Sequence, residues 1–416
     1  MDGWVRFYNA ALTLSLMLVS LASLMLIAQD QSITPGSIRY WALVLPAIAL
    51  PFMALEFVLH AAFRSSAAWL LAFALLSGGW CLAMGDMRAL VQLLLLVWVT
   101  LWASSHLCVL TDAAVKFIFY FTMAAGVAVY AGTTWNPWGL MPGQTLAAFG
   151  AWRVSIFPTV SSTGAFAFLF LLVFTKDRIF SRRSLVPIVI CLYFLIFSYF
   201  RTGLVAITAY LLVYYLLSRC RLTSAMMALV PILVSGALVL GTYLAPYLLV
   251  ELQEIPAVAR LFLRGAVRLN VEEIYFQMYR PWLWAEHLKL FLASDNLMGL
   301  GSFDFAAEVN APTGANEAGT ESLPTRLLAT YGWPAIFLGV FLVERLIHHA
   351  RRRDAWACAC FAPLVYLMMN YGSVLHPTSA FFILSLMIMT RGTDAFPPSL
   401  LALARQHPAR PVGATA

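Results

Sequence analysis

The hydrophobic positions of this chain fall into long runs separated by short polar stretches, and this pattern decides the expected fold class. Most of the runs approach the roughly 20 residues that an α-helix needs to cross the hydrocarbon core of a bilayer. We therefore predict an all-α polytopic membrane protein. About twelve transmembrane helices are expected, centred on residues 8–28, 40–60, 67–84, 89–109, 115–131, 159–174, 185–200, 203–217, 226–249, 323–346, 357–369 and 380–389.

Composition leads to the same class. Hydrophobic residues make up 62% of the chain and charged residues 11%, which excludes an ordinary soluble domain. The first run follows Arg6 without a small-residue cleavage site, so we expect a signal anchor that is retained. None of the six cysteines lies in the longest polar segment, which therefore has no disulfide framework, and no metal or other cofactor is expected.

Lysine and arginine set the expected orientation, because cytoplasmic loops carry an excess of both. With a cytoplasmic N-terminus, the loops on that side contain Arg64, Lys116, Lys176, Arg178, Arg182, Arg183, Arg219, Arg221 and Arg351 to Arg353. The predicted organisation is transmembrane helices 1–9 in residues 1–249, an outer loop in 250–322, helices 10–12 in 323–391 and a disordered cytoplasmic tail in 392–416. In a Gram-negative cell, this places the chain in the inner membrane with its large loop in the periplasm.

Arg201 lies between two apolar runs that together are too long for one span. The chain is therefore expected to reverse at Arg201-Thr202-Gly203, on the outer side. A guanidinium carried into the bilayer costs a few kcal/mol or more. It is kept near a boundary or a polar cavity, where an anion can bind it.

The outer loop is expected to contain two helices. Residues 256–270 suit an amphipathic helix opened by Pro256 and closed by Asn270, with Arg260, Arg264 and Arg268 at i, i+4 spacing. This cationic stripe suits either a substrate or anionic phospholipid headgroups. A second helix is expected from about Pro281 to Leu292, followed by a tight turn at Gly299-Leu300-Gly301.

These segments, in this order, resemble the O-antigen ligase and O-antigen polymerase superfamily. The resemblance runs from Arg201-Thr202-Gly203, through Arg280 ahead of Trp284 and Gly299-Leu300-Gly301, to Glu321-Ser322 shortly before Tyr331-Gly332-Trp333. It implies a glycosyltransferase whose donor is an undecaprenyl-pyrophosphate-linked glycan and which uses neither metal nor nucleotide sugar. Arg201 and Arg280 match the family's essential arginines.

The chemistry fits these groups. Fixed guanidinium groups stabilise the departing pyrophosphate without a metal, and a carboxylate or imidazole accepts the proton of the attacking hydroxyl. Glu321 is the first candidate for that base, with Glu272, Glu273 and His376 behind it. Arg153, in the outer segment 132–158, together with the arginine stripe, is expected to help hold the glycan.

One departure from the family pattern selects between its branches. Ligases of the family usually carry His-Asn where this chain has Glu321-Ser322, which favours the polymerase branch. The expected partners are the lipid-linked glycan, the growing glycan, membrane lipids and a chain-length regulator, and no nucleic acid. Two alternatives remain open: a ligase that transfers glycan to a lipid A core, and a polytopic transporter or flippase.

Overall fold

The computed structural model contains only helices, turns and loops in the part of the chain that it describes, as the sequence predicts. That part comprises residues 2–25, 61–130, 155–157, 160–177, 184–198, 200–256, 258–259, 263, 268–278, 280–303, 305, 308, 322–371 and 379–399. The predicted span at 40–60 and most of the outer segment 132–158 lie outside it.

The helices follow the apolar runs closely. In the first half of the chain they are α1 (Asp2–Met25), α4 (Ala61–Ala83), α5 (Met87–Ser104), α6 (Asp112–Tyr130), α8 (Val160–Phe174), α9 (Leu185–Phe197) and α10 (Arg201–Arg219). In the second half they are α11 (Ser224–Leu252), α13 (Val271–Met278), α14 (Arg280–Ala293), α16 (Leu323–Tyr331), α17 (Ile336–Arg351), α18 (Ala355–Asn370) and α19 (Ala380–Arg391), with 3-10 turns η1 (Asp295–Leu297), η3 (Trp333–Ala335) and η4 (Gly392–Ala395).

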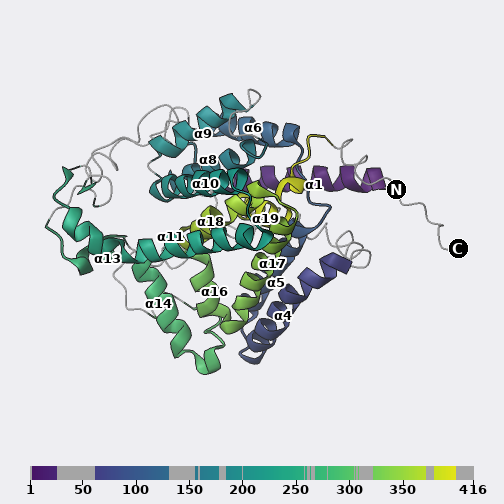
Figure 1. Cartoon of the computed structure of the whole chain (residues 1–416). Coiled ribbons are helices and arrows are strands. Elements are labelled where there is room, and N and C mark those ends of the chain that lie inside the picture. Colours follow the sequence, from purple (N-terminus) through teal and green to yellow (C-terminus); the bar gives the residue numbers. More distant parts are fainter. Residues whose placement is uncertain are drawn as a thin grey trace.

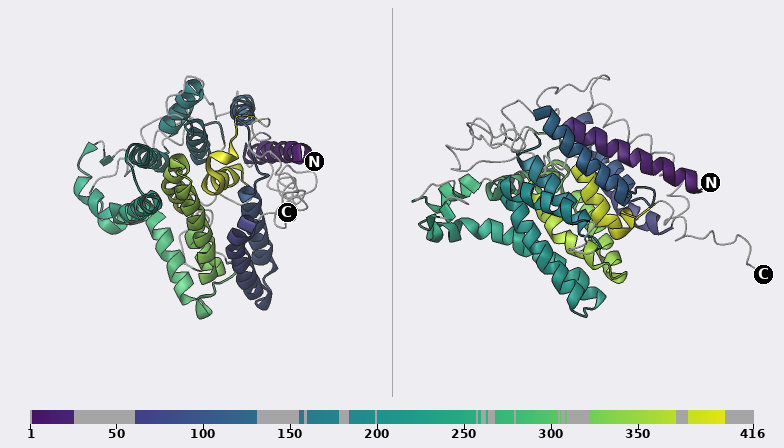
Figure 2. Two further views of the ribbon diagram at one scale, coloured as in Figure 1. Left: turned by 45° about the vertical axis from the view of Figure 1, so that its right-hand side comes forward. Right: turned by 90° about the horizontal axis from the view of Figure 1, so that it is seen from above.

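The centre of the bundle is formed by α8, α18 and α19, and other helices pack around them (Figure 1). All residues of α19 are buried, including polar ones such as Ser385 and Thr390, whose hydroxyls bond to the carbonyls one turn earlier. A helix that is apolar on every side requires cover on every side. The α4–α5 hairpin, blue in Figure 2, packs as a pair beside α17.

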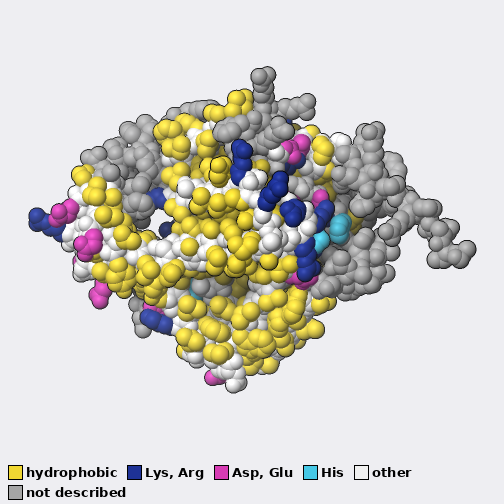
Figure 3. Space-filling model, in the orientation of Figure 1, with side chains coloured by type: hydrophobic (Ala, Val, Ile, Leu, Met, Phe, Trp, Pro, Cys, Tyr) yellow, Lys and Arg dark blue, Asp and Glu magenta, His cyan; other side chains and the backbone are white. Residues whose placement is uncertain are grey.

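Peripheral helices leave large apolar side chains uncovered. On α11, Leu233, Leu240 and Leu248 are about 60% exposed, and much of the face in Figure 3 is hydrophobic. Four described helices, α1, α5, α10 and α11, are long and apolar enough to cross a membrane. An apolar core surrounded by apolar outward faces is the arrangement of a helical membrane protein.

The expected single span at residues 323–346 is wrong, because the chain breaks at Gly332. α16 ends at Tyr331, and Gly332 takes φ 72° before Trp333 and Pro334 form η3. The predicted tight turn contains Gly299 and Gly301, both with positive φ, and it packs against this break. A Cβ at Gly332 would lie 2.3 Å from the carbonyl carbon of Met298. The apolar run is therefore two helices divided by a contact from the outer loop.

The same turn also contacts the α4–α5 connection. The Ser302 hydroxyl donates to Asp86 Oδ2 at 2.7 Å, and Trp80 Nε1 donates to Gly299 O at 3.2 Å. Burial raises the pKa of Asp86, but hydrogen bonds from the Ala89 and Ser302 N–H groups and the Ser302 hydroxyl together hold that pKa below its ordinary value. The α4–α5 connection and the turn that follows α14 are far apart in the sequence, and they therefore meet only in the folded chain.

Candidate functional site

The expected break between two apolar helices is confirmed, but it lies between Phe197 and Arg201, and the residues expected to form the turn, Arg201-Thr202-Gly203, are the first residues of α10. α9 ends at Phe197 and α10 begins at Arg201, with Phe200 at the N-cap position. Phe200 is 2% exposed, and its ring lies over the first turn of α10. A Cβ at Gly203 would lie 2.1 Å from Phe200 Cδ1, so glycine at this position allows the ring to fold back. Arg201 itself is half-buried.

Tyr371 connects this turn to Arg280. The rings of Phe200 and Tyr371 are 4.6 Å apart, and the guanidinium carbon of Arg280 lies 4.7 Å from the Tyr371 ring centroid. A cation at this distance from an aromatic face is attracted by its quadrupole. Segments about 80 residues apart in the sequence thus meet on one buried tyrosine, which directly follows α18.

The end of α18 is capped by α14. Arg280 Nε donates to Asn370 O at 3.2 Å, and Trp284 Nε1 donates to Met369 O at 2.8 Å. The last carbonyls of a helix lack partners within it, and a cation there interacts favourably with the helix dipole. The expected helix from Pro281 is confirmed, and it begins one residue earlier, at Arg280. Its first turn fixes the position of this guanidinium.

A buried histidine that we did not single out from the sequence joins α14 to α16. His287 is fully buried, and its Nδ1 lies 3.0 Å from Thr325 Oγ1. Thr325 in turn donates to Ser322 Oγ at 2.7 Å, and Ser322 directly follows Glu321. Arg280, Trp284 and His287 are spaced i, i+4, i+7 and therefore share one face of α14. This spacing was the signal in the sequence that could have identified His287.

The arginine helix of the outer loop does not extend as expected. Arg268 has φ 62°, a left-handed conformation that an α-helix excludes, so a helix from Pro256 cannot close at Asn270. Instead, Asn270 opens α13: its N–H donates to Glu273 Oε2 at 2.9 Å, and its Oδ1 accepts the Glu273 N–H at 2.8 Å. This is a capping box. The prediction that Arg268 shares one helical face with Arg260 and Arg264 is therefore wrong.

The remaining candidates divide between exposed positions and positions outside the described residues. Arg268, Glu272 and Glu273 are exposed, and the Glu273 carboxylate serves as a helix cap. Phe200, the residue before Arg201, and the guanidinium of Arg280 both contact the ring of Tyr371. Five predicted site residues lie outside the described part of the chain: Arg153, Arg260, Arg264, Glu321 and His376.

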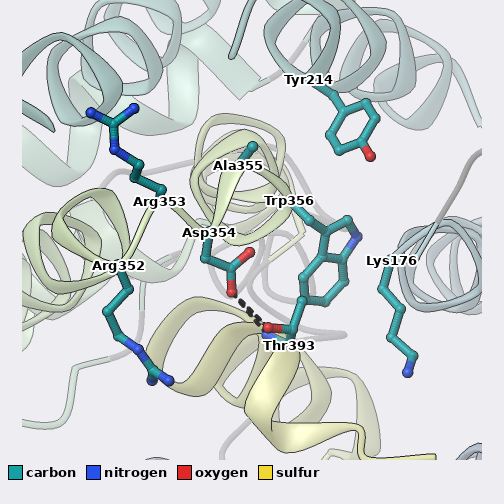
Figure 4. Close-up of a pocket in the computed structure, with 8 residues that line it drawn as sticks. All are labelled: Lys176, Tyr214, Arg352, Arg353, Asp354, Ala355, Trp356 and Thr393. Atoms are coloured by element: carbon teal, nitrogen blue, oxygen red, sulfur yellow. Dashed lines mark hydrogen bonds between the residues drawn. The ribbon is translucent and has the colours of Figure 1, made fainter. Parts of the chain in front are cut away.

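The pair α10 and α18 has a second polar end. The two helices are antiparallel, because Phe200 before α10 meets Tyr371 after α18, while Tyr214 near the end of α10 lines a pocket with the start of α18. We call the region of Arg201, Arg280 and Tyr371 the arginine end. The other region, the pocket end, is lined by Lys176, Tyr214, Arg352, Arg353, Asp354, Ala355, Trp356 and Thr393 (Figure 4).

The two ends are separated by the length of α18. α18 has 16 residues, which at about 1.5 Å per residue separates its ends by roughly 24 Å. Charged side chains gather at both ends, and the helix between them carries none.

The arginine end has the chemistry of an anion site. Guanidinium groups with fixed orientation recognise phosphate and carboxylate oxygens through paired N–H donors. Comparison with models of known protein families and with curated proteins finds no match to this chain.

Proposed function

We propose that this chain is a membrane glycosyltransferase that polymerises undecaprenyl-pyrophosphate-linked oligosaccharide repeat units on the outer face of the bacterial inner membrane. The product would be an O-antigen, a capsule or an exopolysaccharide. The observation that carries the proposal is the convergence of the Arg201 turn and Arg280 on Tyr371. Both arginines were selected from motif order, and the contacts of Phe200 and Arg280 with Tyr371 support their joint role.

The proposed reaction transfers glycan without a metal. An acceptor sugar hydroxyl attacks the anomeric carbon of the donor, a new glycosidic C–O bond forms, and the bond to the pyrophosphate breaks. The electron pair leaves with the pyrophosphate, whose charge Arg201 and Arg280 stabilise. A guanidinium carries five N–H donors, and one of them, Arg280 Nε, donates to Asn370 O.

The hydroxyl proton needs an acceptor, and we propose Glu321 for this role. Its neighbour Ser322 is held by Thr325 and, through it, by His287. Glu321→Gln keeps the shape and removes the base, so the transfer rate should fall by about 10²–10⁴-fold. An unchanged rate would assign the proton to another group.

The direct test is reconstitution. Purified full-length protein, supplied with a lipid-linked repeat unit and no nucleotide sugar or metal, should produce a ladder of polymer. Arg201→Ala should abolish the ladder while the protein remains in the membrane. Arg219→Ala is the matched control, because Arg219 is an exposed arginine at the other end of the same helix. Normal polymer from folded Arg201→Ala protein would overturn the proposal.

A deletion strain separates the polymerase from the ligase. Loss of a polymerase leaves single repeat units on the final acceptor, whereas loss of a ligase leaves full-length chains on the polyprenyl carrier. We expect the first result. Long lipid-linked chains in the deletion strain would restore the ligase reading, with Glu321 in the place of the histidine that ligases carry.

The twelve-helix topology, with the arginine end facing the periplasm, is part of the proposal and has its own test. Of the six cysteines, Cys220 alone is exposed, and it lies at the predicted cytoplasmic end of α10. A membrane-impermeant maleimide should label Cys220 only after permeabilisation. It should label Glu272→Cys, at an exposed position of α13, in cells with an intact inner membrane. The reverse pattern would invert the topology.

A further inference from the structure

We propose that the pocket end binds the phosphate group of an anionic phospholipid from the cytoplasmic leaflet. This site is distinct from the arginine end and does not depend on glycosyl transfer. The pocket has a volume of about 370 Å³, within the size range of small-molecule sites. It lies where α10, a helix long and apolar enough to cross a membrane, comes to its end, which is the level of the lipid headgroups.

Three cations line the pocket, on opposite sides of Asp354 and Trp356. Figure 4 shows Arg352 and Arg353 on one side and Lys176 with Tyr214 on the other. Lys176 pairs with Asp112 at 2.8 Å and donates to Phe396 O, and Arg352 pairs with Asp394. No ion pair or hydrogen bond of the Arg353 side chain joins it to another residue within the described ranges.

The one carboxylate in the lining, Asp354, forms no ion pair with Arg353 within the described ranges and bonds to neutral donors instead. Asp354 Oδ1 accepts the Ala357 N–H at 3.0 Å and caps α18. Asp354 Oδ2 accepts the Thr393 N–H at 3.1 Å and its hydroxyl at 3.0 Å. These bonds hold the Asp354 side chain in place in the pocket lining. The side chain of Arg353, which also lines the pocket, is exposed.

The backbone of Arg353 strengthens the argument. Its φ is 57°, a left-handed conformation that costs a residue with a Cβ on the order of 1 kcal/mol, and it follows the C-terminus of α17, where glycine is the preferred residue. Arginine at this position therefore makes the folded protein less stable than glycine would. Strain of this kind points to a role for the side chain.

The remaining lining suits a headgroup better than a free ion. Trp356 and Tyr214 also line the pocket, and Trp and Tyr are enriched at the membrane interface. Basic pockets between helices on the cytoplasmic side are suited to lipid phosphates. The structure therefore favours a phosphate that arrives with glycerol and acyl chains attached.

The test compares two neighbouring arginines. Full-length protein in nanodiscs should retain phosphatidylglycerol in native mass spectrometry, and phosphatidylglycerol should raise its unfolding temperature more than phosphatidylcholine does. Arg353→Gln should weaken retention by about tenfold or more, the scale of a lost hydrogen bond to a charged group. Arg351→Gln is the matched control, because Arg351 is exposed, lies two residues away and does not line the pocket.

A second variant separates binding from folding. Arg353→Gly removes the charge and the backbone strain together, so the protein should unfold at a higher temperature and yet lose phosphatidylglycerol. Equal weakening by Arg351→Gln and Arg353→Gln would overturn the pocket in favour of a diffuse positive field. Retained binding in Arg353→Gly would also overturn it. Stabilisation by inorganic phosphate alone, with displacement of lipid, would overturn the assignment to a phospholipid.

Discussion

The arginine end and the pocket end of the α10–α18 pair both gather cations, but they hold them differently. At the arginine end, Arg280 is set by an aromatic ring and a helix carbonyl. At the pocket end, Lys176 and Arg352 are set by aspartates. At the pocket end each of these two cations lies against a carboxylate, whereas at the arginine end a ring and a carbonyl orient the Arg280 guanidinium. If Arg201 and Arg280 bind the pyrophosphate as proposed, substitutions at the arginine end should reduce turnover more than substitutions at the pocket end.

The largest effect that this contrast predicts is the loss of turnover in Arg280→Ala. Removal of one fixed donor to a developing negative charge costs about 10²–10³-fold in rate. Arg280→Lys should rescue little, because the ammonium lacks the planar group that lies on Tyr371 and bonds Asn370 O. Initial rates of polymer formation measure both variants.

The control for Arg280 lies on the same helix. Lys289 is exposed and paired with Glu286 at 2.6 Å, so Lys289→Ala should retain normal turnover. Normal turnover in Arg280→Ala protein that unfolds at the wild-type temperature would remove the distinction between the two ends.

The next effect concerns the packing of the arginine end. Gly203→Ala places a Cβ 2.1 Å from Phe200 Cδ1, so the ring must shift and Tyr371 with it. Overpacking of this kind costs about 1–3 kcal/mol, and we expect a lower unfolding temperature with reduced turnover. Gly241→Ala in α11 is the control, since nothing lies within 4 Å of its added Cβ. Equal stability of both variants would mean that the arginine turn tolerates repacking.

A smaller effect is expected from His287, which holds α14 against α16. His287→Leu keeps an apolar volume and removes the bond to Thr325, while Thr325 keeps its bond to Ser322. The loss of one such bond costs about 0.5–1.5 kcal/mol. Thermal unfolding measures the stability, with Leu288→Ala as an exposed control on the same helix. An unchanged unfolding temperature would show that the histidine contributes nothing to this contact.

The smallest effect concerns the ion pair at the pocket end. Burial raises the pKa of Asp394, but the hydrogen bond and charge of Arg352 outweigh it and hold the pKa below its ordinary value. A lowered pKa contributes stability above the ordinary pKa of aspartate, and that stability is lost as the pH falls through the lowered value. Both partners are about half exposed, so we expect about 0.2–1 kcal/mol.

The measurement is the pH dependence of the unfolding temperature. The difference between wild-type protein and Asp394→Asn should be present at neutral pH and vanish in acid. A difference that persists below the lowered pKa would assign the contribution of Asp394 to packing and not to its charge.

The sequence by itself determined the class of the protein, because long apolar runs leave few structures other than membrane helices. It also predicted a break close to Arg201, although the turn lies just before the predicted residues, and it located the start of α14 to within one residue, since Gly, Pro and charge interrupt a helical pattern locally. It failed where a distant segment decided the outcome. The run at 323–346 is continuous in hydropathy, and only the contact of the Met298 turn with Gly332 makes it two helices.

Pairing between distant side chains was decided by the tertiary structure alone. The sequence around Tyr371 does not indicate that its ring contacts Phe200 and Arg280. The sequence around His287 does not indicate a hydrogen bond to Thr325. Periodicity places a residue on a helix face, but it does not state which helix covers that face. The sequence therefore determined which residues carry charge in an apolar chain. The packing of α14, α16 and α18 decided which of them meet, because a buried cation or imidazole is stable only where another element supplies its partner.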